Sequence, residues 1–467
     1  MVLVRTLLTV AVLLLAAPPL GAFTPDQPWP PDPKLFDPPG TEVAPGLKVG
    51  DTLDQSNADL AKDLLPPEVF AHYKSGGYRN PIASFPTGIY HYEKDFIAAT
   101  KENEGKYDID SSTGTIIEKA TGKPPAYIYG IPFPTLSADD PNAGLKALWN
   151  QFHVYWNQGD VRAESLVIWA NPDGVDRVST NAVDFQYYQN QHPEYRRENP
   201  QGFNQQFIAI TKTPVDLEGT VAMSFRYQDP KKRDSVWSYV PAMRRVRPIS
   251  PANRSDGFLG SDLAQDDGNF FDAKPEDFVW KTVGLRDNLR MVDPVSIKGG
   301  AGKPRWMPET GYHNDWPPTS EVPAAGYMKE GWKGLAWAPV SGALAKRKFW
   351  VVEGVPRDRY YLFGRLELWI DAETWAGAWN RKFSWKGELL NTYGVQAYLS
   401  HPTSKKDGDR VEWLWASQQA WQCAENVKMN RATLAGIRAR PDGPLDRRVT
   451  HNIDQLFNLQ SLARFGK

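Results

Sequence analysis

The strongest constraint on the fold is a change in hydrophobic period. Beyond residue 159, apolar side chains recur at every second position, which is the spacing of a β-strand with one buried face. Turn signals such as Pro172-Asp173-Gly174 and Lys386-Gly387 separate many of these segments, and this pattern is typical of an antiparallel meander. The sequence therefore predicts a mainly β fold with added helices (α+β). Strands are expected at 164–169, 205–211, 219–227, 236–240, 348–353, 365–371, 378–385 and 389–400.

Three of these strands, at 221–227, 365–371 and 378–385, have one apolar face. Leu366 and Leu368, for example, alternate with Arg365 and Glu367. Such a sheet either packs on helices or curves around an apolar ligand; the alternation fits both, and alone it favours packing on helices. If the sheet curves, its apolar faces converge on the concave side. The residues then expected to form a cavity wall are Met223, Phe225, Tyr227, Tyr239, Leu366, Leu368, Trp379 and Phe383.

Helical spacing precedes the strands. Leu145, Leu148 and Trp149 recur at intervals of three and four, which predicts a helix over 139–159 that begins near Asp140 and carries a partly exposed His153. Residues 57–73 predict two helical pieces separated at Pro66-Pro67. A tail helix is expected within 446–465. Either the 139–159 helix or the tail helix could cover the concave side of a curved sheet.

The N-terminal region predicts export. Arg5 precedes a short apolar run and the small residues of Leu20-Gly21-Ala22, so residues 1–22 are interpreted as a signal peptide. Residues 23–56 are rich in proline and predict an extended lead with little capacity to form a sheet. Residues 57–467 are expected to form a single large β domain with an N-terminal helical elaboration. It contains a mostly looped 251–284 segment, with a short helix near 275–283, and a Gly/Pro-rich insertion at about 298–346.

Composition and motifs exclude several classes of protein. The chain has 54 Lys+Arg against 55 Asp+Glu, which argues against non-specific nucleic-acid binding. It has no recognised catalytic motif and no closely spaced histidines, so no catalytic residue, metal or cofactor is predicted. Asp262, Asp266 and Asp267 lack calcium-loop spacing and are expected on a solvated loop. Cys423, the single cysteine, is expected to be a small buried residue.

Two features keep other binding modes open. Arg244, Arg245 and Arg247 form a local basic patch, and arginine forks suit carboxylate or phosphate head groups. The 18 tryptophans could stack on sugars, which keeps a secreted enzyme or a glycan-binding protein as the alternative interpretation.

Several motifs together resemble a known family. Trp237–Ile249 contains the sequence WSYVPAMRRVRPI and is followed by DGFLGSD at Asp256–Asp262. These segments, together with the turns at Asp371–Thr374 and Lys386–Leu389, resemble the outer-membrane lipoprotein-sorting-like proteins of Gram-negative bacteria. Upstream, Tyr129–Pro134 resembles a longer branch of that group, which is known only as a domain of unknown function. The resemblance covers about residues 76–465.

The resemblance implies a fold and a role. The superfamily resembles the LolA/LolB periplasmic carriers, in which a curved antiparallel sheet forms an incomplete barrel closed by helices over an apolar cavity. It therefore favours the ligand-enclosing sheet. It also implies a carrier or adaptor for a lipid or another hydrophobic compound, in the periplasm or at the periplasmic face of the outer membrane. The implied partners are an RND/MMPL-type exporter and an outer-membrane protein.

Overall fold

A computed structural model describes the fold of most of the chain. It describes residues 37–85, 94–154, 160–193, 196–250, 254–268, 270–292, 342–400, 416–438 and 453–466. The signal peptide expected at 1–22, residues 23–36 of the lead and nearly all of the 298–346 insertion lie outside these ranges.

One large sheet dominates the described residues. Its thirteen strands are β7 (Asp160–Asn171), β8 (Gly174–Tyr187), β9 (Phe203–Thr213), β10 (Val221–Tyr227), β11 (Ser235–Val240), β12 (Arg245–Ile249), β13 (Phe278–Val292), β14 (Ala343–Pro356), β15 (Arg365–Asp371), β16 (Gly377–Phe383), β17 (Leu389–Ser400), β18 (Ala416–Asn426) and β19 (Arg431–Arg438). They are hydrogen-bonded in the order β12-β11-β10-β9-β8-β7-β19-β18-β17-β13-β14-β15-β16.

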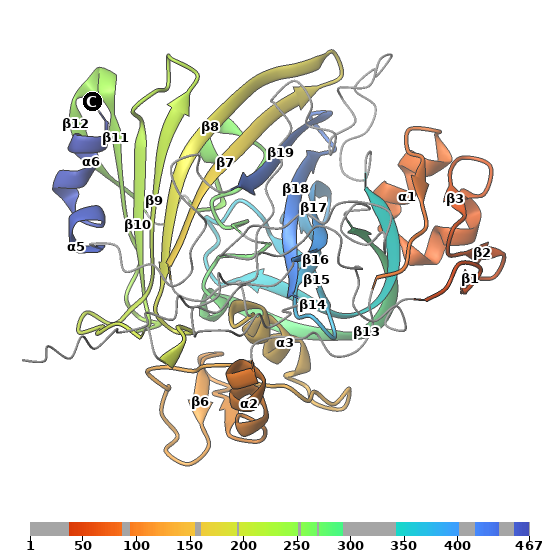
Figure 1. The fold of residues 1–467 in the computed structure, drawn as a ribbon, viewed down its shortest axis with the longest axis horizontal. Helices are drawn as coiled ribbons and strands as arrows, with labels where there is room; N and C mark the ends of the chain where they lie inside the picture. The colour runs from red at the N-terminus through yellow and green to blue at the C-terminus, as the bar shows by residue number, and fades with distance from the viewer. Residues whose placement is uncertain are drawn as a thin grey trace, which may run out of the picture.

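The sheet is strongly curved and does not close into a complete barrel (Figure 1). All its described ladders are antiparallel except a single parallel pairing between β13 and β17 at Val292 and Ala397. At one end β16 also pairs with β17, so the sheet curls back on itself there. At the other end of the order, β12 pairs with β11. The expected mainly β, incomplete-barrel fold is thus confirmed.

The concave side of the sheet is filled by a helix and a long loop (Figure 1). Helix α3 (Ala143–Phe152) packs against β13, β14 and β15. The loop between β12 and β13 contributes buried Leu263, Phe270 and Phe271 to the same central hydrophobic cluster. Gly144 permits the close approach of α3, because a Cβ atom there would lie 2.9 Å from Cβ of Val352.

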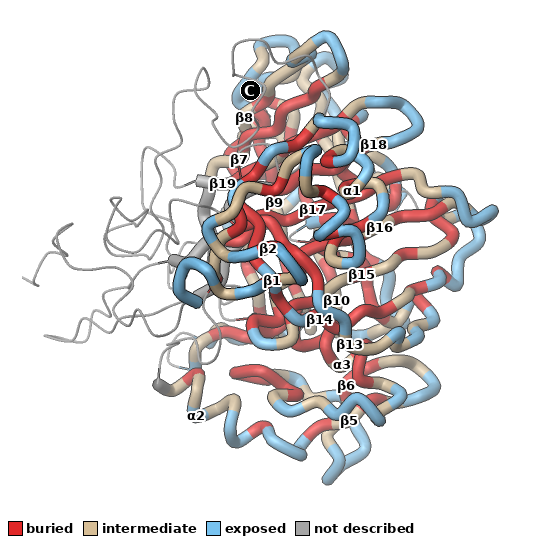
Figure 2. The backbone as a smooth tube through the Cα atoms, turned by 90° about the vertical axis from the view of Figure 1, so that its right-hand side faces the viewer, coloured by how far each residue is buried: buried red, intermediate tan, exposed pale blue. Residues whose placement is uncertain are grey.

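Two separate groups of short elements pack on the outer face of the sheet. An N-terminal unit includes β1 (Glu42–Ala44), β2 (Leu47–Lys48), β3 (Thr52–Leu53), the 3-10 helix η2 (Ala58–Leu64) and α1 (Pro67–Lys74), and it packs on β13, β14 and β16. The C-terminal helices α5 (Ile453–Leu456) and α6 (Leu459–Phe465) pack on β10 and its neighbours. In Figure 2 the buried residues follow the large sheet and α3, and the connecting turns are exposed.

The remaining described elements are short. They are β4 (Asn80–Pro81), β5 (Tyr107–Ile109), β6 (Ile116–Glu118) and α2 (Lys94–Glu102), with the 3-10 helices η5 (Pro241–Met243), η7 (Phe258–Gly260) and η8 (Pro275–Asp277). Among the described helices, none combines the length and apolar character needed to cross a membrane.

Several local expectations need correction. The short helix expected near 275–283 ends at Asp277, and β13 begins at the next residue because β14 pairs along its whole length. Residues 42–53 form short strands rather than only an extended lead, because Gly46 allows the turn that joins β1 to β2. Helix α3 spans Ala143–Phe152 and is shorter than the helix expected over 139–159, and Asn142 occupies its N-cap position. The two helical pieces predicted within 57–73 are confirmed.

Candidate functional site

The structure distributes the eight expected wall residues among different parts of the molecule. Leu366 and Leu368 belong to the central cluster on the concave side. Met223, Phe225 and Tyr239 lie beneath the C-terminal helices on the outer face. The curvature therefore does not bring the eight side chains to one wall.

The other three wall residues also lie apart. Trp379 is fully buried under the N-terminal unit, and its indole nitrogen donates to the Leu289 carbonyl at 3.0 Å. Phe383 lies below the Arg365 guanidinium, 3.8 Å from the ring centre. Tyr227, near the end of β10, lines the larger of the two pockets described below.

The expected head-group contacts, Arg244, Arg245 and Arg247, are exposed on η5 and β12 at one end of the sheet order. None of the three lines either of the two pockets described below.

The acidic cluster in the 254–277 loop is buried, not solvated as expected. Asp266 is 4% exposed and Asp267 is 1% exposed. Asp267 pairs with Lys382 of β16 at 2.6 Å, and Asp262 pairs with Arg431 of β19 at 2.9 Å. The loop enters the concave side because its apolar residues are buried there, and the charges it carries are compensated by distant partners.

Arg254 is the centre of a buried ionic network. Its guanidinium contacts the carboxylates of Asp266, Asp234 and Asp272, the last two at 2.8 and 3.4 Å. Arg226 joins the same network through Asp272 at 2.9 Å and Asp234 at 3.2 Å. We call these five residues the arginine–aspartate network. It ties β10 and the start of β11 to the loop that fills the concave side.

The charges of this network stabilise one another. Burial alone would lower the pKa of Arg254, but Asp266 and Asp234 raise it overall. Burial raises the pKa of Asp234, yet Arg226 and Arg254 outweigh that effect and hold it below its usual range. Asp272 differs from Asp234, because burial outweighs the nearby Arg226 and Arg254 and raises its pKa above the usual range.

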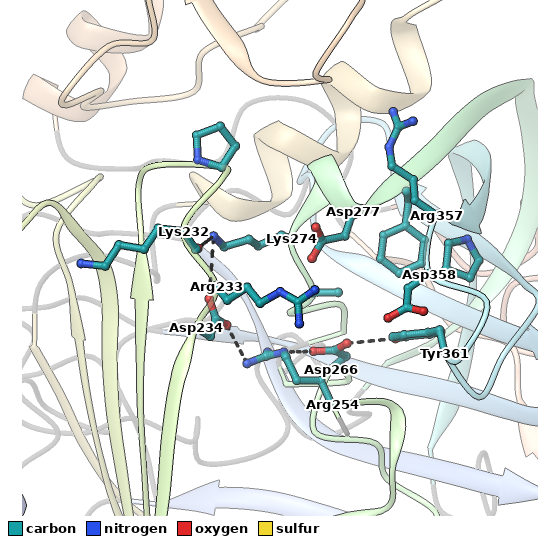
Figure 3. Close-up of a pocket in the computed structure, with 14 residues that line it drawn as sticks. Lys232, Arg233, Asp234, Arg254, Asp266, Lys274, Asp277, Arg357, Asp358 and Tyr361 are labelled. Atoms are coloured by element: carbon teal, nitrogen blue, oxygen red, sulfur yellow. Dashed lines mark hydrogen bonds and ion pairs between the residues drawn. The ribbon is translucent and has the colours of Figure 1, made fainter. Parts of the chain in front are cut away.

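A charged pocket of about 170 Å³ borders the network (Figure 3). Tyr361 donates a hydrogen bond to Asp266 at 2.9 Å on one side of the pocket. Lys274 lies on the opposite side, and its ammonium group donates to the carbonyl of Lys232 at 2.5 Å. Arg233, Asp277 and Asp358 also line this pocket and carry charges of both signs.

A second, larger pocket of about 390 Å³ lies beside the charged pocket, and Pro230 and Lys274 line both. We call it the aromatic pocket. Its apolar lining comes from the 115–128 segment, from α3 and from the end of β10. The apolar residues with large side chains in this lining are Ile116, Tyr127, Ile128, Trp149, Phe152 and Tyr227. Its volume lies within the usual range for small-molecule sites.

Polar groups also line the aromatic pocket. His153 is 1% exposed, although the sequence predicted a partly exposed residue, because the chain around Asn190 contacts the C-terminal end of α3. Burial lowers the pKa of His153 to about 4, so its imidazole is neutral at pH 7. Glu276 of η8 lines the same pocket, and burial raises its pKa to about 7.

Most of these site residues were not identified from the sequence. The network joins positions 226, 234, 254, 266 and 272, and no spacing rule connects them. One signal was present: Asp272 directly follows Phe270-Phe271, and two adjacent phenylalanines next to an aspartate are unusual in a solvated loop. Within the described residues, no three His, Cys, Asp or Glu side chains are grouped as metal ligands would be.

Cys423 lies in β18 and is 3% exposed, as expected for a small buried residue. Burial raises the pKa of its thiol well above the usual range, so the reactive thiolate is disfavoured.

The fold and site define a β-rich protein with a curved, incompletely closed sheet, a loop buried on its concave side and a ligand-sized pocket beside that loop. The chain belongs to the DUF1329 family, described as a protein of unknown function, whose model matches residues 52–463. No curated protein matches the chain.

Three solved structures are similar to this chain. A DUF1329 family protein from Desulfovibrio piger is 15% identical, covers 69% of this chain and 99% of its own, and has a TM-score of 0.44. A proposed outer membrane lipoprotein-sorting protein domain from Vibrio parahaemolyticus is 16% identical, with 70% and 100% covered and a TM-score of 0.41. A LolA superfamily protein from Nitrosomonas europaea is 12% identical, with 70% and 99% covered and a TM-score of 0.38.

Proposed function

We propose that this protein is a non-enzymatic carrier or adaptor that binds a hydrophobic small molecule, lipid or lipid-like, in the aromatic pocket. The observation that carries the proposal is the pocket's composition. Tyr127, Trp149 and Phe152 give it a largely apolar wall in a space of about 390 Å³. Contact with such a wall stabilises a bound apolar group by about 25 cal/mol per Å² of buried surface.

The structure around the pocket supports a binding role. Trp149 donates its indole hydrogen to the Gly114 carbonyl at 2.9 Å, and Tyr127 donates its hydroxyl hydrogen to the Gln191 carbonyl. These bonds fix two of the aromatic rings before any ligand arrives, and a preformed site lowers the entropic cost of binding.

The proposal includes the expected location and partners. A carrier in the periplasm or at the periplasmic face of the outer membrane would receive its ligand from an RND/MMPL-type exporter and pass it to an outer-membrane protein. The family resemblance supports this part of the proposal.

Ala126 offers a direct test. It is exposed and lines the aromatic pocket, so the Ala126→Trp substitution would place a large side chain across the space without disturbing the core. We expect wild-type protein to bind the uncharged apolar dye N-phenylnaphthylamine with one site per chain. We expect Ala126→Trp to weaken this binding by at least about tenfold, while Tm stays nearly unchanged because exposed substitutions usually cost little.

The matched control is Val215→Trp. Val215 is 85% exposed and lines neither pocket, so this variant should bind the dye like wild type. Equal dye binding by wild type and Ala126→Trp would refute the aromatic pocket as the ligand site.

A further inference from the structure

The aromatic pocket contains a buried hydrogen-bond acceptor whose chemistry is fixed by its surroundings. Nδ1 of His153 lies 2.9 Å from the backbone carbonyl of Trp149. A carbonyl oxygen only accepts, so Nδ1 must carry the hydrogen. Because the ring is neutral at pH 7, its other nitrogen, Nε2, presents a lone pair and acts as an acceptor.

This acceptor has no protein partner. Among the described residues, no group donates a hydrogen bond to Nε2 of His153, although the side chain is 1% exposed and lines the aromatic pocket. The residue itself is well held, since Asn190 donates to its backbone carbonyl at 2.9 Å. Nε2 does not belong to the fully enclosed, unpartnered polar atoms of the described residues, so it is open to the pocket, and a hydroxyl group on a bound ligand can donate to it there.

The cations that line the same pocket are already satisfied. Arg226 is paired with Asp234 and Asp272. The ammonium group of Lys274 donates to the carbonyls of Asp229 and Lys232 at 3.2 and 2.5 Å. Neither cation is therefore available to a carboxylate or phosphate head group without breaking an existing bond.

The acidic groups of the pocket do not favour a cationic ligand at mildly acidic pH. Glu276 is within 3.5 Å of the Thr115 hydroxyl, and burial keeps its carboxyl largely protonated below about pH 7. Asp229 is exposed at the rim, where it already accepts a bond from the Lys231 backbone at 2.9 Å. Water screens such an exposed charge.

These observations specify the ligand further. Building on the proposed function, we propose that the aromatic pocket selects an uncharged amphiphile that carries a hydroxyl group, and that this hydroxyl donates a hydrogen bond to Nε2 of His153. The apolar part of the ligand lies against Trp149, Phe152 and Tyr127. Anionic and cationic amphiphiles of the same size bind more weakly.

A displacement assay with four ligands of equal chain length tests this. Decanol, methyl decyl ether, decanoate and decylammonium each compete with bound N-phenylnaphthylamine at about pH 6, where the acid is ionised and the amine is protonated. We expect decanol to displace the dye at a concentration roughly tenfold lower than the ether, which has no donor. Decanoate and decylammonium should require higher concentrations than decanol.

Two variants separate the hydrogen bond from simple packing. His153→Leu should reduce the preference for decanol over the ether to about one. His153→Gln, which offers an amide oxygen near the position of Nε2, should retain part of the preference. The ratio between two ligands is compared within one variant, so a general loss of affinity or stability does not change it.

The outcomes are distinguishable. Decanoate or decylammonium displacing the dye as readily as decanol, or an unchanged alcohol-to-ether preference in His153→Leu, would overturn the selection of a hydroxyl ligand. That result would leave the carrier proposal intact. Failure of the dye to bind wild-type protein at all would instead contradict the proposed function.

Discussion

Two buried charge clusters in this molecule have similar chemistry and different surroundings. In the first, Asp371 lies between Arg347 at 2.9 Å and Arg290 at 3.2 Å. Asp371 and Arg290 have no exposed surface, and none of the three lines either pocket. We call this the sealed cluster. In the second, the arginine–aspartate network, four of the five members line these pockets. Arg254, Asp234 and Asp266 line the charged pocket, and Arg226 lines the aromatic pocket.

The difference indicates two roles. The sealed cluster joins β13, β14 and β15, which are neighbours in the sheet. It therefore stabilises the sheet itself. The arginine–aspartate network joins the sheet to the buried loop beside both pockets, so it shapes the binding region. Removing a charge should therefore cost most stability where no water can replace the lost partner.

The largest expected effect comes from Asp371→Asn. This change removes the carboxylate that Arg290 and Arg347 share, while Arg347 keeps its contact with Glu373 at 2.9 Å. Breaking a buried pair typically costs about 3–5 kcal/mol. Urea unfolding of the variant should show a loss of that size. A matched control is Asp173→Asn in the exposed turn between β7 and β8, which should change stability by less than about 0.5 kcal/mol.

A smaller loss is expected for Asp266→Asn. Arg254 would keep Asp234 and Asp272 as partners, and the charged pocket admits water. The lost charged hydrogen bonds predict a decrease of roughly 1.5–3 kcal/mol in the free energy of unfolding. If urea unfolding shows Asp266→Asn to be more destabilising than Asp371→Asn, the distinction between the two clusters is wrong.

The pH dependence sharpens the same comparison. Burial raises the pKa of Asp371, but Arg347 and Arg290 outweigh it and hold the pKa at about 2. A carboxyl with a lowered folded-state pKa contributes stability that is present above its unfolded value of 3.8 and is lost as the pH falls towards 2. The stability difference between wild type and Asp371→Asn should therefore shrink by about 2 kcal/mol between pH 4 and pH 2, measured by urea unfolding. A difference that stays constant across this range would contradict the assigned ion pair.

At pH 5 the smallest effect is expected at Glu276, which lines the aromatic pocket. Burial raises its pKa to about 7, above its ordinary value of 4.5. The folded state then favours the protonated form, so wild type loses stability as the pH rises from about 4.5 through 7. Glu276→Gln should have nearly the wild-type Tm at pH 5 and a higher Tm than wild type at pH 8. An equal Tm difference at both values would show that this carboxyl does not titrate as assigned.

The sheet was largely predictable because its signal is local. Alternation identified β10 from Val221 to Tyr227 and β15 from Arg365 to Asp371, since each buried face is encoded within a few residues. Strand β13 was missed because its first half is mostly exposed and carries Gly284, Arg286 and Asp287. It is a strand through its long pairing with β14, a tertiary effect that overrides local preference.

The candidate site was hard to predict for the opposite reason. The loop containing Asp266 and Asp267 looks solvated because the partners that compensate its charges are distant in sequence. Arg254 is twelve positions from Asp266, and Lys382 comes from another strand. Likewise, the helical position of His153 gave no sign that the chain around Asn190 covers it. Burial of a polar residue depends on which segments meet, and periodicity does not encode that.

The central claim is that the aromatic pocket holds a hydrophobic ligand. The most direct test is mass spectrometry of compounds extracted from wild-type protein and from Ala126→Trp, each purified from its native source without detergent. The account predicts one apolar compound recovered at about one molecule per chain from wild type, and its loss from Ala126→Trp with retention in Val215→Trp. Recovery of no such compound from wild type, or equal recovery from Ala126→Trp, would contradict it.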